Sequence, residues 1–89
     1  MRGTVWRRQC ERDLKRIIQR GKDREKLLDI VGLLGADGRV PVQNRPHKLS
    51  GKYAGLWECH IESDWLLIYD VTDTEVLLAR TGTHADLFE

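Results

Sequence analysis

The stretch Trp65-Leu66-Leu67-Ile68-Tyr69 is the longest apolar run in the sequence and decides the fold. Successive side chains of a β-strand point to opposite faces of a sheet, so a run without polar residues predicts a strand buried on both faces. Such a strand lies in the middle of its sheet. Turn-forming residues bound the run, with Ser63-Asp64 before it and Thr72-Asp73 after it.

Further strands are predicted on either side of this run. Apolar residues alternate with polar ones after Leu56, and those on the apolar face are Trp57, Cys59 and Ile61. The segment from Glu75 to Thr81 predicts the next strand. Short turns join all three strands, so we expect an antiparallel three-stranded meander. The residues from Gly3 to Arg7 predict an additional short strand at the N-terminus.

Two amphipathic helices are predicted before the meander. In the first, which starts near Gln9 and ends at Gly21, the apolar positions follow helical spacing: Cys10, Leu14, Ile17 and Ile18. Asp23 is a suitable N-cap for the second helix, which Gly35 and Gly38 should end. The sequence therefore predicts one α+β domain over residues 1–89, in the order β-α-α-β-β-β. Its helical hairpin packs on a small, mostly antiparallel, twisted sheet.

Length and composition exclude several classes of protein. The 89 residues are 40% hydrophobic and 33% charged, which is enough apolar material for one small domain. No apolar run approaches the roughly 18 residues of a membrane helix, and the first eight residues lack the apolar core of a secretory signal. The two cysteines are too few for a disulfide framework, so we expect reduced thiols and a cytoplasmic protein.

Positive charge is concentrated at the N-terminus. The first 26 residues hold ten Lys/Arg and four acidic residues, whereas the whole chain has a net charge of only +1. Several of these cations fall off the apolar stripe of the first helix: Arg12, Lys15, Arg16 and Arg20. Such a surface suits a polyanion. The alternative interpretation is a helix face that is charged only for solvation.

All three histidines follow residue 46. His47 lies in the long connection from Ala36 to Gly55, His60 is on the polar face of its strand, and His84 comes just after the last strand. Asp64 occupies a turn, and Arg80 shares strand parity with His84. Histidines that exchange protons at neutral pH, with an arginine to stabilise developing charge, suit general acid–base cleavage of a phosphodiester.

Two other interpretations of the histidines remain open. They could ligate zinc together with Asp64 or Cys59, although the closely spaced ligand pairs of structural zinc sites are absent. They could also simply cap the ends of strands. Two aromatic residues, Trp65 and Phe88, are candidates to stack on an RNA base, against the alternative of packing in the core.

Several motifs together resemble one bacterial family. They are His47-Lys48-Leu49-Ser50-Gly51, Glu58-Cys59-His60-Ile61, Asp64 to Tyr69, Arg80-Thr81-Gly82-Thr83-His84 and Leu87-Phe88. This set is similar to the YafQ branch of the RelE/ParE-type toxins of type II toxin–antitoxin systems. The histidines argue against the gyrase-poisoning ParE branch, which lacks them. The resemblance implies ribosome-dependent mRNA cleavage in the A site and neutralisation by a cognate antitoxin. The positions that match the family's functional residues are His47, His60, Asp64, Trp65, Arg80, His84 and Phe88.

A mechanism follows from these residues as a hypothesis. The substrate 2′-hydroxyl attacks the neighbouring phosphorus, which leaves a 2′,3′-cyclic phosphate or its 3′-phosphate hydrolysis product, and a 5′-hydroxyl. We expect His84 to be the general acid and His47 or Asp64 the base, while His60 holds the phosphate or orients a partner residue. No metal and no small-molecule cofactor are required. The alternative is a non-catalytic RNA- or protein-binding module, a relic of a toxin, which a cell would tolerate when it is expressed alone.

Overall fold

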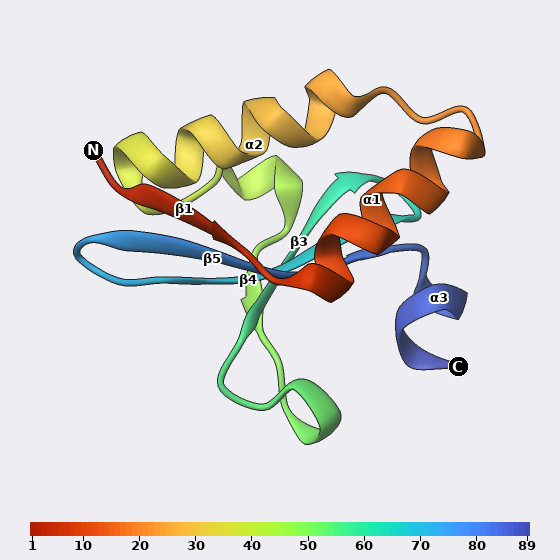
Figure 1. The fold of residues 1–89 in the computed structure, drawn as a ribbon. Coiled ribbons are helices and arrows are strands. Elements are labelled where there is room, and N and C mark those ends of the chain that lie inside the picture. Colours follow the sequence, from red (N-terminus) through yellow and green to blue (C-terminus); the bar gives the residue numbers. More distant parts are fainter.

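A five-stranded sheet in the order β1-β5-β4-β3-β2 forms the middle of the computed structural model, which describes all 89 residues (Figure 1). The strands are β1 (Gly3–Trp6), β2 (His47–Lys48), β3 (Trp57–Glu62), β4 (Trp65–Val71) and β5 (Glu75–Gly82). The expected meander is confirmed, because β4 pairs antiparallel with both β3 and β5. The N-terminal strand β1 joins the sheet parallel to β5, and β2 is an additional short strand beside β3.

Three helices accompany the sheet: α1 (Arg8–Gln19), α2 (Arg24–Asp37) and α3 (His84–Phe88). The Asp23 side chain accepts a hydrogen bond from the backbone N–H of Glu25 at 3.0 Å, so it is the predicted N-cap of α2. This helix continues through Gly35 and ends at Gly38, which has a φ of 73°. Glycine is favoured there because a left-handed backbone strains residues with a Cβ.

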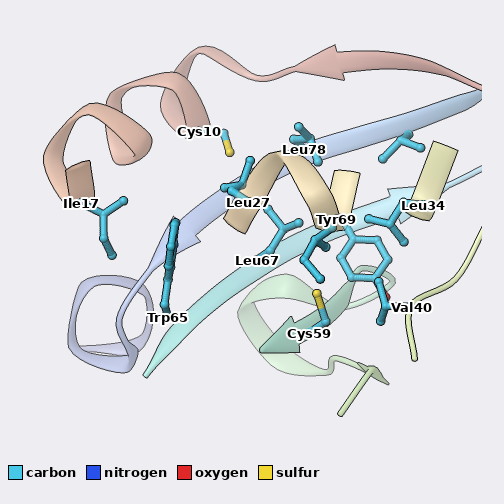
Figure 2. Close-up of a cluster of buried hydrophobic side chains, with 12 residues drawn as sticks. Cys10, Ile17, Leu27, Leu34, Val40, Cys59, Trp65, Leu67, Tyr69 and Leu78 are labelled. Atoms are coloured by element: carbon cyan, nitrogen blue, oxygen red, sulfur yellow. The ribbon is translucent and has the colours of Figure 1, made fainter. Parts of the chain in front are cut away.

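Helices α1 and α2 cover one face of the sheet. From β4, the side chains of Trp65, Leu67 and Tyr69 point to this face and belong to a cluster of 12 buried residues. Figure 2 shows them against Cys10 of α1 and Leu27 of α2. Burial raises the pKa of the Cys10 thiol to about 12, and that of Cys59 in the same cluster to about 12. Both thiols are free.

The other face of β4 is buried as well, which confirms the prediction made from its apolar run. Leu66 and Ile68 form a second, smaller cluster with Leu87 of α3. The connection between α2 and β3 completes this cover with partly buried side chains: Leu49, Tyr53 and Leu56. Figure 1 shows the helical turn Gly51–Tyr53 of this connection on the side of the sheet opposite to α2.

The end of β5 differs from the strand pattern expected from the sequence. We expected Arg80 and His84 to share one strand face, but β5 ends at Gly82 and α3 begins at His84. Within β5, Leu78 lies opposite Tyr69 whereas Arg80 lies opposite Ile68. One extra residue in β5 therefore forms a bulge, which reverses the sheet face to which each later side chain of the strand points.

No helix of the protein has the length and apolarity that a membrane span requires.

Candidate active site

His84 and Asp64 form the most closely held pair among the predicted site residues. Oδ1 of Asp64, in the turn between β3 and β4, accepts the backbone N–H of His84 at 2.9 Å and lies 2.8 Å from its Nδ1. These two hydrogen bonds lower the pKa of the Asp64 carboxyl below its usual range. The carboxylate accepts a hydrogen bond from Nδ1–H, so Nε2 is the imidazole nitrogen left for a substrate.

The start of α3 positions His84 for this contact. Thr83 is the N-cap of the helix, and its hydroxyl accepts the backbone N–H of Asp86 at 3.2 Å. The Asp86 carboxylate accepts the N–H of Thr83 at 3.0 Å in return, which completes a capping box. Gly82 precedes it with a φ of 154°, and a Cβ there would come within 2.9 Å of the Asp86 side chain. Glycine therefore allows the sharp change from strand to helix.

His47 and His60 share one buried carboxylate, that of Glu58. Strand β2 places His47 directly opposite Glu58 on β3. Oε1 of Glu58 lies 3.3 Å from Nε2 of His47 and 3.9 Å from Nε2 of His60. The Glu58 side chain is only 5% exposed, whereas that of His47 is 51% exposed. Two imidazoles of the predicted set thus lie beside one buried carboxylate.

Arg45 joins these two histidines from the connecting segment. Its Nη2 lies 3.1 Å from Nδ1 of His60, and its carbonyl oxygen lies 3.1 Å from Nδ1 of His47. A carbonyl only accepts, so the Nδ1 of His47 carries a proton, and Nε2, which faces Oε1 of Glu58, is the unprotonated nitrogen of the neutral ring. Asn44 also donates its side-chain N–H to the carbonyl of His60 at 2.8 Å.

A row of ring contacts connects the two histidine groups with the C-terminus. The ring centroids of His60 and His84 are 6.0 Å apart, and those of His84 and Phe88 are 6.2 Å apart. Phe88 meets Tyr53 edge to face at 5.5 Å, and Nη1 of Arg80 donates to the Tyr53 hydroxyl at 3.3 Å. The structure therefore brings His47, His60, Asp64, His84, Phe88 and Arg80 into one continuous set of contacts.

Trp65 does not belong to the accessible surface of this set, so its assignment as a base-stacking residue is wrong. The residue is 0% exposed and lies in the main core (Figure 2). Its indole Nε1 donates to the Thr81 hydroxyl at 2.9 Å. The parity of β4 turns the ring towards α1 and α2, whereas Phe88 is 44% exposed and remains the candidate for stacking.

The basic face of α1 is only partly free. Arg12 and Lys15 are exposed. Arg16 instead pairs with Asp13 at 3.0 Å, and Arg20 donates two hydrogen bonds to Asp86 at 2.7 and 3.1 Å. All four cations face outward, as expected, but acidic groups of α1 and α3 already pair with Arg16 and Arg20, whose side chains are 43% and 46% exposed.

The sequence analysis missed four side chains of this region: Asp13, Arg45, Tyr53 and Glu58. Glu58 has the same strand parity as His60, which is a signal that could have identified it. Asp13 follows Cys10 by three residues and precedes Ile17 by four, which is the spacing of the buried stripe of α1. Nothing in the sequence distinguishes Arg45 or Tyr53, because both lie in the irregular connection.

Comparison with known proteins places this chain in one family. Residues 2–89 match the family described as bacterial toxin of type II toxin–antitoxin system, YafQ. The mRNA interferase toxin YafQ of Escherichia coli strain K12 is 40% identical over 81 residues, which cover 90% of this chain and 88% of that protein. The chain therefore belongs to the YafQ family of type II toxins.

Solved structures agree with this assignment. The toxin of the E. coli DinJ–YafQ complex is 36% identical, covers 100% of both chains and has a TM-score of 0.89. A copper-bound mutant toxin from Helicobacter pylori is 31% identical, covers 99% of this chain and 100% of its own, and also has a TM-score of 0.89. Both the expected α+β fold and the resemblance to this family are confirmed.

Proposed function

We propose that this chain is an mRNA interferase, an endoribonuclease that cleaves mRNA on the ribosome by metal-independent acid–base catalysis. The observation that carries the proposal is the His84–Asp64 pair beside His60, with His47 oriented by a buried carboxylate. Relatives that bear the name mRNA interferase toxin support the same activity. Two histidines with different partners are what one proton acceptor and one proton donor require.

The proton acceptor in this mechanism is His47. Its Nε2 takes the proton of the substrate 2′-hydroxyl as the O2′–P bond forms, and the nearby Glu58 carboxylate stabilises the resulting imidazolium. We assign this step to His47 rather than Asp64. The Asp64 carboxylate already accepts two hydrogen bonds from His84, and its lowered pKa makes it a weaker base.

The proton donor is His84. Asp64 stabilises its imidazolium through Nδ1, and Nε2 then gives its proton to the 5′-oxygen as the P–O5′ bond breaks. The products are a 2′,3′-cyclic phosphate and a 5′-hydroxyl, so atoms and charges balance without a metal ion. Hydrogen bonds between catalytic side chains are commonly long without substrate and shorten when substrate binds.

Three other residues bind and stabilise the reacting RNA. Arg80 contacts the phosphate and stabilises the charge that develops on its oxygens. His60 contacts the same phosphate, with its ring held by Arg45 at 3.1 Å. Phe88, which is 44% exposed next to His84, stacks on a neighbouring base.

The partners follow from charge and from the relatives. The exposed cations Arg12 and Lys15 of α1 contact ribosomal RNA, and the mRNA lies against the histidines. The E. coli YafQ structures in complex with the DinJ antitoxin support a cognate antitoxin for this chain. A protein that acts on ribosomes works in the cytoplasm.

Cleavage of a defined mRNA on programmed bacterial ribosomes tests this function. The wild-type chain should produce a 2′,3′-cyclic phosphate end, and a substrate with 2′-deoxyribose before the scissile bond should stay intact. Asp29→Asn, at an exposed position of α2, is the matched control and should cleave like the wild type. Cleavage of the deoxy substrate would refute the mechanism. Ribosome binding without any cleavage would favour a non-catalytic module.

A further inference from the structure

A buried carboxylate, that of Asp13, lies next to the site without a part in the mechanism above. Its side chain is 0% exposed, although it belongs to the basic helix α1. Five hydrogen bonds reach its two oxygens, and the donors are Gln9 Nε2, Arg16 Nη2, Arg80 Nε, Arg80 Nη2 and the backbone N–H of Thr81. These donors exceed the roughly four lone-pair positions of a carboxylate, so its hydrogen-bonding capacity is filled.

The sheet topology explains why a carboxylate is needed at this place. Strand β1 pairs with β5 only as far as Trp6, which lies opposite Leu78. Beyond that point β5 has no parallel neighbour, and the buried N–H of Thr81 would lack an acceptor there. Oδ2 of Asp13 accepts it at 3.2 Å. Where β1 ends, the Asp13 side chain of helix α1 therefore accepts the hydrogen bond that a neighbouring strand would otherwise accept from β5. This places a buried negative charge next to the sheet.

The same carboxylate holds Arg80 by a two-pronged contact. Nε of Arg80 donates to Oδ2 at 2.7 Å and Nη2 donates to Oδ1 at 3.1 Å. Nη1 donates to the Tyr53 hydroxyl at 3.3 Å. These bonds use three of the five N–H groups of a guanidinium and fix the plane of the group. Two N–H groups remain, on a side chain that is 19% exposed.

We infer that Asp13 is a positioning residue for RNA cleavage, which orients the Arg80 guanidinium so that its remaining N–H groups meet the reacting phosphate. The inference rests on the proposed function of the site. Without the carboxylate, Arg80 keeps its charge but can rotate among many rotamers. Displacement of a stabilising group by about 1 Å can cost about 100-fold in rate. The loss should appear in the cleavage step rather than in the affinity for ribosomes.

The first test replaces the acidic residue with its isostere. Asp13→Asn should lower the single-turnover cleavage rate at saturating toxin by about 100-fold, with little change in ribosome affinity. Gln9→Ala is the matched control, because it removes a different hydrogen bond from the same carboxylate. Its rate should stay near that of the wild type. The Nε–H signal of Arg80 in NMR spectra should be protected from exchange in the wild type and in Gln9→Ala, and exposed in Asp13→Asn.

A double-mutant cycle separates positioning from a purely structural role. In an Arg80→Ala background, Asp13→Asn should slow cleavage no further. Arg80→Lys gives a second measurement if Asp13→Asn folds poorly, since lysine keeps the charge but cannot make the two-pronged contact. Its rate should also fall by about 100-fold.

The possible results distinguish the positioning role of Asp13 from the proposed function of the site. An equal loss of rate from Asp13→Asn in both backgrounds, or full activity of Arg80→Lys, would overturn the positioning role. An active wild type with an unchanged Asp13→Asn rate would overturn only the role of Asp13. A wild-type chain that cleaves no RNA would overturn the proposed function, and this role with it.

Discussion

His84 and Asp64 are twenty residues apart in the sequence, yet one carboxylate oxygen of Asp64 meets both the backbone N–H and the imidazole Nδ1 of His84 within 2.9 Å. The contact joins the β3–β4 turn to the first residue of α3. Both side chains remain more than half exposed, at 55% for His84 and 63% for Asp64. The pair is therefore oriented from within the protein and open towards a substrate.

Removal of this imidazole should abolish most of the activity without unfolding the protein. We expect His84→Ala to lower the cleavage rate about 10²–10⁴-fold, the usual contribution of one proton-transfer group. The exposed ring makes few stabilising contacts, so circular dichroism and thermal unfolding should match the wild type. Growth after induction measures the same loss in cells. A His84→Ala protein that arrests growth fully would contradict the acid role.

The two aromatic candidates should respond in opposite ways. Trp65→Phe leaves a cavity in the core and removes the hydrogen bond to Thr81, which should lower the free energy of unfolding by about 1–3 kcal/mol. Phe88→Ala should change stability by less than about 1 kcal/mol but weaken binding of mRNA, because stacking contributes about 1–3 kcal/mol per base. Urea unfolding and RNA affinity measure the two effects. Reduced RNA affinity in folded Trp65→Phe would restore a direct role for Trp65.

The exposed part of the basic helix should control association with ribosomes. Arg12→Glu combined with Lys15→Glu should weaken co-sedimentation with ribosomes and reduce its dependence on salt, while the fold persists. Arg16→Glu and Arg20→Glu are less informative, because each places a second acid beside Asp13 or Asp86 and should lower stability. Unchanged sedimentation of the Arg12/Lys15 variant at two salt concentrations would mean that this face serves only solvation.

Stability should depend on pH through Asp86. Its hydrogen bonds with Arg20 and then with Thr83 lower the pKa of the carboxyl to about 2. A lowered pKa adds stability above the pKa of the unfolded chain, about 3.9, and this stability disappears as the pH falls through the folded value. We expect a contribution of about 1–2 kcal/mol, reduced by solvent around the half-exposed Arg20.

Asp86→Asn provides the measurement. Urea unfolding between pH 2 and 7 should show the variant less stable than the wild type at neutral pH, and the difference should shrink towards pH 2. A constant difference across this range would mean that the variant acts through the cap of α3 rather than through the charge of Asp86.

Cleavage should not depend on a resident transition metal. Histidines exchange the protons and Arg80 supplies positive charge, so a zinc chelator that spares ribosomal magnesium should leave the rate unchanged. Copper should be tested by titration as well as zinc, because a related H. pylori toxin binds copper in its crystal structure. Stoichiometric metal in the purified protein, together with loss of activity on its removal, would instead support a three-histidine metal site.

Much of the architecture could be predicted because it depends on local patterns. The apolar run Trp65–Tyr69 required two buried faces, and helical spacing of Cys10 and Ile17 identified the buried side of α1. Asp23 and Gly38 marked the limits of α2, since capping and left-handed turns depend on a few adjacent residues. The motif residues likewise indicated the family before any contact between them was known.

The sequence by itself thus determined the α+β class, the meander, the two long helices and the residue types for RNA cleavage. Only the tertiary structure decided which side chains meet. The bulge in β5 and a helix that begins at His84 changed the parity expected for this residue, and burial removed Trp65 from the accessible site. Asp13 reaches Arg80 across 67 residues because β1 ends early at the edge of β5. Contacts of this kind depend on packing between distant segments, which no local periodicity encodes.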